Sequence, residues 1–155
     1  MEYIGLAIIH QALRSDENFG KVLIVRKEEK VPSGATLTWG FPSSRLIPGK
    51  TLEESLVDST KAKVNLDISI IKPIFAWLHP DHYASDNKGG QMYWANITYF
   101  AAEPEYQSYK IVPDGKKILE AKWVDPRDVV SHFTTKSAPE IGIYLGELKI
   151  KPREV

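Results

Sequence analysis

One segment, residues 39–68, fixes a strand, a loop and a helix in that order: WGFPSSRLIPGKTLEESLVDSTKAKVNLDI. Pro42 is expected to end the strand at the start of this segment, because proline cannot donate a hydrogen bond to a sheet. Thr51 is the expected N-cap of the helix, with Glu54 as its capping-box partner. Asn65 can close the helix in the left-handed conformation. Any fold of this chain must therefore carry a strand–loop–helix unit in its first half.

β-Branched and apolar residues also dominate runs on both sides of this unit, and such runs predict strands. The expected strands are residues 3–12, 21–28, 36–41, 66–79, 91–102 and 118–124. The polar residues 15–20 predict a hairpin connection, and residues 80–90 predict a loop. Ser43 and Ser44 are expected to form a tight turn, and Asp114-Gly115 another.

Two further helices are expected in the last third of the chain. Asp125-Pro126 begins a short one, since proline is tolerated at the first helical position. Ser137 and Glu140 form a second capping-box pattern, and the apolar residues 141, 144, 145 and 148 follow it at helical spacing. Strands, an inserted helix, more strands and a closing helix predict an α+β fold with a mixed β-sheet between helices.

Length and composition narrow the class of protein. The 155 residues suit a single domain spanning residues 1–155, and 20 basic against 20 acidic side chains give no broad charged surface for nucleic acid or membrane. The absence of cysteine excludes disulfides, thiolate metal sites and a cysteine nucleophile. No stretch approaches the roughly 18 apolar residues of a membrane span, so we expect a cytoplasmic protein.

The unit at residues 39–68 resembles the signature segment of the Nudix family, which is a loop, a helix and a turn. Pro42 stands where the family closes its strand, and Pro48-Gly49 stand where the loop enters the helix. The signature positions Gly, Glu, Arg-Glu, Glu-Glu and Gly-apolar then fall on Ser44, Lys50, Asp58, Ser59, Ala62, Lys63, Asn65 and Leu66. The resemblance implies a Nudix-like α/β/α sandwich, and it covers nearly the whole chain. Nudix domains often dimerise, so a homodimer is an expectation from the resemblance.

The carboxylates of this signature are missing. Nudix hydrolysis uses divalent cations to activate water, and Mg²⁺ needs carboxylate oxygens at near-octahedral geometry. The helix face that would supply them offers a hydroxyl, a methyl and an ammonium from Ser59, Ala62 and Lys63. We therefore predict a degenerate Nudix box that has lost its metal site, with no cofactor and no metal-binding residues.

Binding without hydrolysis is the function this pattern favours. Arg26, Arg45, Lys50 and Lys63 could meet phosphates, and bases or sugars could stack on Trp39, Trp77, Tyr93 and Trp94. The expected ligand is a nucleotide or nucleotide sugar, and a protein or other macromolecular partner is a further hypothesis. The competing interpretation of each ring is a core or cross-strand residue.

A divergent hydrolase is the alternative. It would cleave a nucleoside diphosphate derivative with Mg²⁺ held by displaced ligands from Glu53, Glu54, Asp58 and Glu120. Helix-start electrostatics equally explain the first two of these residues. His79 and His82, with Asp86 nearby, have a spacing seen in metal sites, but loop polarity is the interpretation we favour.

Overall fold

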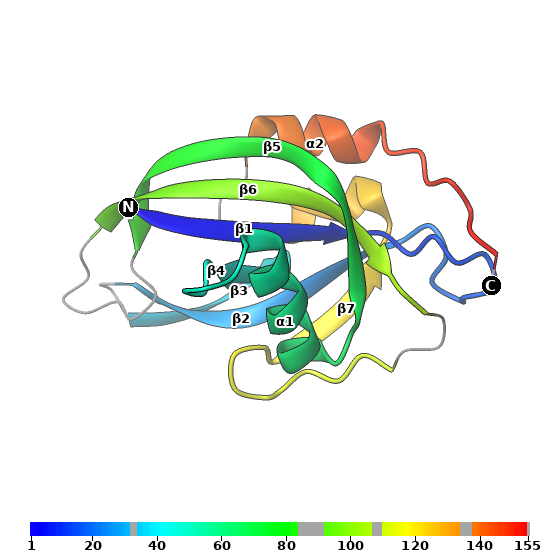
Figure 1. Ribbon diagram of the computed structural model, residues 1–155, viewed down its shortest axis with the longest axis horizontal. Coiled ribbons are helices and arrows are strands. Elements are labelled where there is room, and N and C mark those ends of the chain that lie inside the picture. The colour runs from blue at the N-terminus through cyan, green and yellow to red at the C-terminus, as the bar shows by residue number, and fades with distance from the viewer. Residues whose placement is uncertain (32–33, 84–91, 107–109, 134–137, 155) are drawn as a thin grey trace.

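The computed structural model describes residues 1–31, 34–83, 92–106, 110–133 and 138–154 (Figure 1). For residues 29–31, 34–37, 80–83, 92 and 93 it describes the backbone only. Two sheets form the centre. One has the strand order β4-β1-β6-β5, built from β1 (Glu2–Ile9), β4 (Ser43–Arg45), β5 (Ile68–Tyr83) and β6 (Met92–Pro104). The other has the order β3-β2-β7, built from β2 (Val22–Val31), β3 (Gly34–Gly40) and β7 (Glu120–Val124).

The first sheet is mixed, because β1 runs parallel to β6 while the β1–β4 and β5–β6 pairs are antiparallel. The second sheet is antiparallel throughout. Successive side chains of a strand point to opposite faces of its sheet. Both faces of each sheet carry hydrophobic side chains, which belong to two separate core clusters.

Helices cover both sides of the strands, with α1 (Leu52–Val64) and α2 (Pro139–Gly146) on different sides (Figure 1). Leu56 and Val64 of α1 pack in one core cluster with Leu23 and Val25 of β2. Ile141 and Leu145 of α2 pack in another with residues of β1, β2 and β6. The predicted α+β sandwich with mixed pairing between helices is confirmed.

The local signals around α1 are confirmed. Thr51 Oγ1 accepts a hydrogen bond from Glu54 N at 3.1 Å, and the Glu54 carboxylate accepts one from Thr51 N at 3.0 Å. Asn65 takes the left-handed conformation with φ 59°, and its N–H donates to Lys61 O at 3.0 Å. This capping fixes where the helix begins and ends, and so fixes which side chains its last turn presents.

The predicted tight turn at Ser43 and Ser44 is wrong. Both residues belong to β4 and pair with Leu6 and Gly5 of β1, which buries Ser44 against the sheet. The loop predicted for residues 80–90 is wrong for its first residues, because β5 runs on to Tyr83, which pairs with Met92; residues 84–90 lie outside the described part of the chain. β5 is an edge strand with register shifts, where proline is tolerated.

The hairpin expected at residues 15–20 closes at its base. His10 and Val22 form an antiparallel bridge, and Gln11 exchanges backbone hydrogen bonds with Lys21 and Gly20 at 2.9 Å each. β1 ends at Ile9, and beyond the bridge β1 and β2 pair in different sheets. The tight turn at Asp114 is confirmed, with Gly115 at φ 74°.

The short helix after Asp125 consists of two 3-10 turns, η2 (Pro126–Asp128) and η3 (Val130–His132). Asp125 Oδ1 accepts from Arg127 N at 2.9 Å, as the cap prediction requires. The expected cap at Ser137 is not the one observed, because Ala138 is the N-cap of α2 and Pro139 takes its first position. Ser137 itself lies outside the described residues. In the described part of the chain no helix has the length and apolarity needed to cross a membrane.

Candidate functional site

Lys63, in the last turn of α1, points at the backbone of β4. Its Nζ donates to Ser43 O at 3.2 Å, and Ser59 Oγ donates to the same carbonyl oxygen at 3.1 Å. Ser59 and Lys63 are spaced by one helical turn, which places them on one face of α1. The half-buried ammonium therefore lies between the helix and the strand that follows Pro42.

Other cations lie near enough to Lys63 to influence its charge. Burial lowers the pKa of the Lys63 ammonium, and the positive charges of Lys27, Lys117 and Arg45 lower it further, while Asp114 acts in the opposite sense. We call Lys27, Arg45, Lys63 and Lys117 the basic cluster. A depressed lysine pKa means that the folded protein stabilises this charge less well than water does. A bound anion would supply the missing stabilisation.

The turn at Asp114 joins the backbone of Lys117 to the end of α1. Asp114 N donates to Lys63 O at 2.8 Å, so the turn is attached to the end of α1. Asp114 Oδ1 accepts from the backbone N–H groups of residues 116, 117 and 118 at 2.9 Å each. Partial desolvation raises the pKa of the Asp114 carboxyl group, but these three hydrogen bonds and the charge of Lys63 outweigh that effect, so its pKa is lowered overall. This carboxylate is thus engaged by backbone donors as well as by the charge of Lys63.

The side chains beside this helix face do not fit Mg²⁺. The positions that would supply carboxylates hold Ser59, Ala62 and Lys63. Asp58 forms an ion pair with Lys50, and the hydrogen bond between them raises the pKa of Lys50. The Glu54 carboxylate is occupied in the helix cap. Among the residues that the structure describes, no three acidic or histidine side chains are grouped in a way that could hold an ion.

Glu120, the fourth residue of the hydrolase alternative, lies away from α1. It pairs with Arg26, whose Nη2 is 2.5 Å from Glu120 Oε1. Arg26 and Lys27 are adjacent in β2, so they project to opposite faces of the sheet. Lys27 shares its face with Leu23 and Val25, which pack against α1. The structure therefore does not bring Glu53, Glu54, Asp58 and Glu120 to one place.

Arg26 and Trp39 form a second group on the other face. The Arg26 guanidinium lies 5.9 Å from the centre of the Trp39 ring, and Lys122 Nζ lies 4.6 Å from it. The His132 ring packs edge-on against Trp39, with 6.4 Å between the two ring centres. Two of the predicted ligand-binding residues are thus together, but apart from Lys63.

The other candidates are dispersed. Trp77 packs against the core cluster of α2 and stacks on His79 at 4.7 Å between ring centres. Trp94 is 52% exposed on β6. The side chains of Tyr93 and His82, and the whole of Asp86, lie outside the described residues.

Sequence reasoning missed Lys27 and Lys117. Alternation along β2 was the available signal for Lys27, because Leu23, Val25 and position 27 must share a face. Lys117 offered no such signal, since its position depends on how the Asp114 turn attaches to α1. Arg45, which was predicted to bind phosphate, is exposed on β4, and its Nη1 lies 3.8 Å from Glu2 Oε1.

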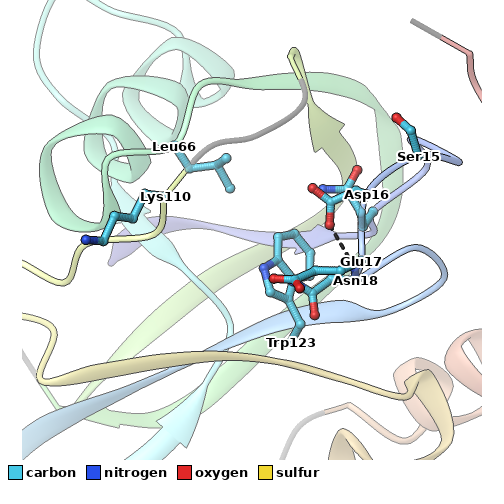
Figure 2. Close-up of a pocket in the computed structure, with 8 residues that line it drawn as sticks. Ser15, Asp16, Glu17, Asn18, Leu66, Lys110 and Trp123 are labelled. Carbon is cyan, nitrogen blue, oxygen red and sulfur yellow. Dashed lines mark hydrogen bonds between the residues drawn. The ribbon is translucent and has the colours of Figure 1, made fainter.

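A pocket of about 450 Å³ opens elsewhere, between the β1–β2 connection and β7 (Figure 2). It contains none of the residues predicted to bind ligand or metal. The recess and the basic cluster are therefore separate features of the molecule.

Comparison with known proteins identifies the fold. No family model matches the chain, and no curated protein matches it in sequence. Solved structures do match: a NUDIX hydrolase from Nitrosomonas europaea aligns with TM-score 0.65 and 15% identity, over 94% of this chain and 70% of that one. A C. elegans Ap4A hydrolase aligns with TM-score 0.62 and 15% identity, over 94% and 93%. An ADP-ribose pyrophosphatase from Streptococcus suis aligns with TM-score 0.59 and 12% identity, over 99% and 96%. The chain thus has the Nudix fold, at identities that carry no activity with them.

Proposed function

We propose that this chain is a Nudix-fold domain that binds a phosphorylated, nucleotide-like ligand at the basic cluster and does not hydrolyse it. The observation that carries the proposal is the half-buried Lys63 ammonium beside the Ser43 carbonyl, with Lys27, Lys117 and Arg45 around it. A phosphate beside Lys63 would be attracted by the combined positive charge of the cluster, and charge-assisted hydrogen bonds to phosphate are among the strongest in proteins.

The same charge reversal argues against the usual hydrolytic mechanism. A cation at Lys63 repels Mg²⁺, and the nearby carboxylate of Asp58 is bound to Lys50. Without a metal-activated water, the helix face can bind and orient a phosphate but has no described group placed to activate the nucleophile. The chemistry that remains is recognition.

Fold analogy supports the ligand class. The similar structures include an Ap4A hydrolase, an ADP-ribose pyrophosphatase and a UDP-X diphosphatase, whose names denote nucleotide derivatives. We propose a compound of that kind, a nucleotide or nucleotide sugar, for this chain. A cytoplasmic, single-domain homodimer is the setting we expect, and it stays a prediction.

Thermal unfolding in the presence of EDTA tests the proposal. ADP-ribose, UDP-glucose and inorganic diphosphate are added separately, with adenosine at equal ionic strength as the control without phosphate. A ligand at 100 times its Kd stabilises the fold by about 2.7 kcal/mol, which a melting curve resolves easily. We expect a phosphate compound, and not adenosine, to raise the Tm without metal. A Tm rise that requires Mg²⁺, or release of phosphate or mononucleotide from the ligand, would instead support the hydrolase alternative.

A further inference from the structure

The pocket in Figure 2 is lined by one aromatic side chain, Trp123, and by an acidic wall. Leu66 follows α1 and is 1% exposed, and Trp123 lies on β7. Asp16 and Glu17 come from the connection between β1 and β2, and they supply two carboxylates. Figure 2 shows Lys110 on the wall away from these carboxylates, with its ammonium turned away from them. The recess therefore combines an aromatic surface with negative charge.

A buried amide lines the same pocket. Gln11 is only 3% exposed, and its Oε1 accepts from Leu13 N at 3.1 Å. That bond fixes which end of the amide is oxygen, because a backbone N–H needs an acceptor. The remaining Nε2 donates to no residue that the structure describes. Nε2 is not one of the side-chain atoms that are sealed from solvent without a partner, so it keeps contact with solvent and is open to an acceptor inside the pocket.

The indole of Trp123 adds a second donor without an acceptor. Its Nε1 makes no hydrogen bond within the described part of the chain, although the side chain is partly buried. This N–H is likewise not sealed from solvent without a partner, so it is open to solvent and accessible to an acceptor on a ligand. Two unused donors beside an aromatic face indicate a ligand with a hydrogen-bond acceptor on an apolar body.

Hydrogen bonds hold the backbone of the acidic wall and the Asp16 carboxylate. Asp16 Oδ1 accepts from Asn18 N at 2.8 Å, and Asp16 O accepts from Phe19 N at 3.0 Å. Gln11 N donates to Lys21 O, and Gly20 N donates to Gln11 O, both at 2.9 Å. The carboxylates are thus presented by a turn that is already ordered, which reduces the entropy cost of binding.

We infer that this pocket binds a small organic amine whose ammonium lies by Asp16 and Glu17 and whose apolar body, bearing a hydroxyl or carbonyl, rests on Trp123. The carboxylates favour a cation and disfavour a phosphate. An ammonium also interacts favourably with the face of an indole. The site is separate from the basic cluster, so it does not depend on the proposed function above.

Three compounds of nearly equal shape and different charge test this inference. Tyramine carries an ammonium, tyrosol is neutral, and 4-hydroxyphenylacetate is an anion. Each is titrated into the ¹⁵N-labelled protein at millimolar concentration, and the indole N–H resonances are followed, with Trp123→Phe identifying the relevant one. We expect tyramine to shift the Trp123 resonance and the other two compounds to leave it nearly unchanged. No shift with tyramine, or equal shifts with all three compounds, would overturn the inference.

Matched variants locate the site. Glu17 is exposed and makes no ion pair with a described residue, so Glu17→Gln should fold normally. It should raise the tyramine Kd about tenfold. Glu140→Gln, which removes an exposed carboxylate on α2, should leave that Kd unchanged, as should Lys63→Gln. Equal effects of Glu17→Gln and Glu140→Gln would show general charge attraction and refute a built site.

Discussion

Replacing Lys63 with glutamine should weaken binding of a nucleotide phosphate far more than the same change at Lys61. Both lysines lie in α1, but Lys63 is half-buried in the basic cluster, whereas the Lys61 side chain is 48% exposed and pairs with Asp67 at 3.1 Å. A hydrogen bond to a charged group contributes about 1.5–3 kcal/mol, which corresponds to roughly 10- to 150-fold in Kd. A surface charge contributes about 0–1 kcal/mol, or at most roughly fivefold.

The Lys63→Gln variant should remain folded, because Ser59 Oγ still donates to the Ser43 carbonyl oxygen. Isothermal titration with ADP-ribose in EDTA and low salt measures both variants, and circular dichroism confirms their folding. Salt should weaken wild-type binding, since part of the attraction is screened. Equal losses at positions 61 and 63, or undiminished affinity in Lys63→Gln, would refute the role of the basic cluster.

Three further predictions concern the frame that holds this site. Thr51→Ala should lower the free energy of unfolding in urea by about 1 kcal/mol and Thr51→Ser by much less, because the hydroxyl caps Glu54 N; equal losses would exclude the cap as the cause. Asn65→Ala should cost about 1–2 kcal/mol and Asn65→Gly less, because the residue sits at φ 59°; a glycine variant as unstable as the alanine variant would contradict this. Burial lowers the pKa of His10 below 6.5 despite the nearby Glu103. Its contribution to stability is therefore full above pH 6.5 and lost as the pH falls through the folded-state pKa. Between about pH 8 and about pH 5, the free energy of unfolding should fall less steeply with decreasing pH for His10→Gln than for wild type. The same pH dependence in both proteins would show that His10 is not the group responsible.

The fold was accessible from local sequence signals that agree with one another. The capping box at Thr51, the left-handed Asn65 and the β-branched and apolar strand segments each report on nearby residues, and each is confirmed. The errors arose where pairing with a distant strand decides the outcome. Ser43 and Ser44 read as a turn by composition, yet pairing with β1 makes them a strand.

The candidate site was only partly accessible, because it depends on which faces of different elements meet. The register of the Nudix signature predicted that Ser59 and Lys63 share one face of α1, and both do contact the Ser43 carbonyl oxygen. Sequence could not show that Arg26 and Trp39 lie on the opposite face from Lys63, because that separation follows from how β2 packs against α1. Nor could it show that Glu120 is bound to Arg26.

Titration of Mn²⁺, monitored by electron paramagnetic resonance in the presence of ADP-ribose, tests most directly whether an ammonium has replaced the metal. The signal of free Mn²⁺ should fall no further with protein present than with ADP-ribose alone, and ADP-ribose should remain intact after prolonged incubation. A protein-dependent loss of that signal at micromolar Mn²⁺, accompanied by release of AMP, would contradict the account.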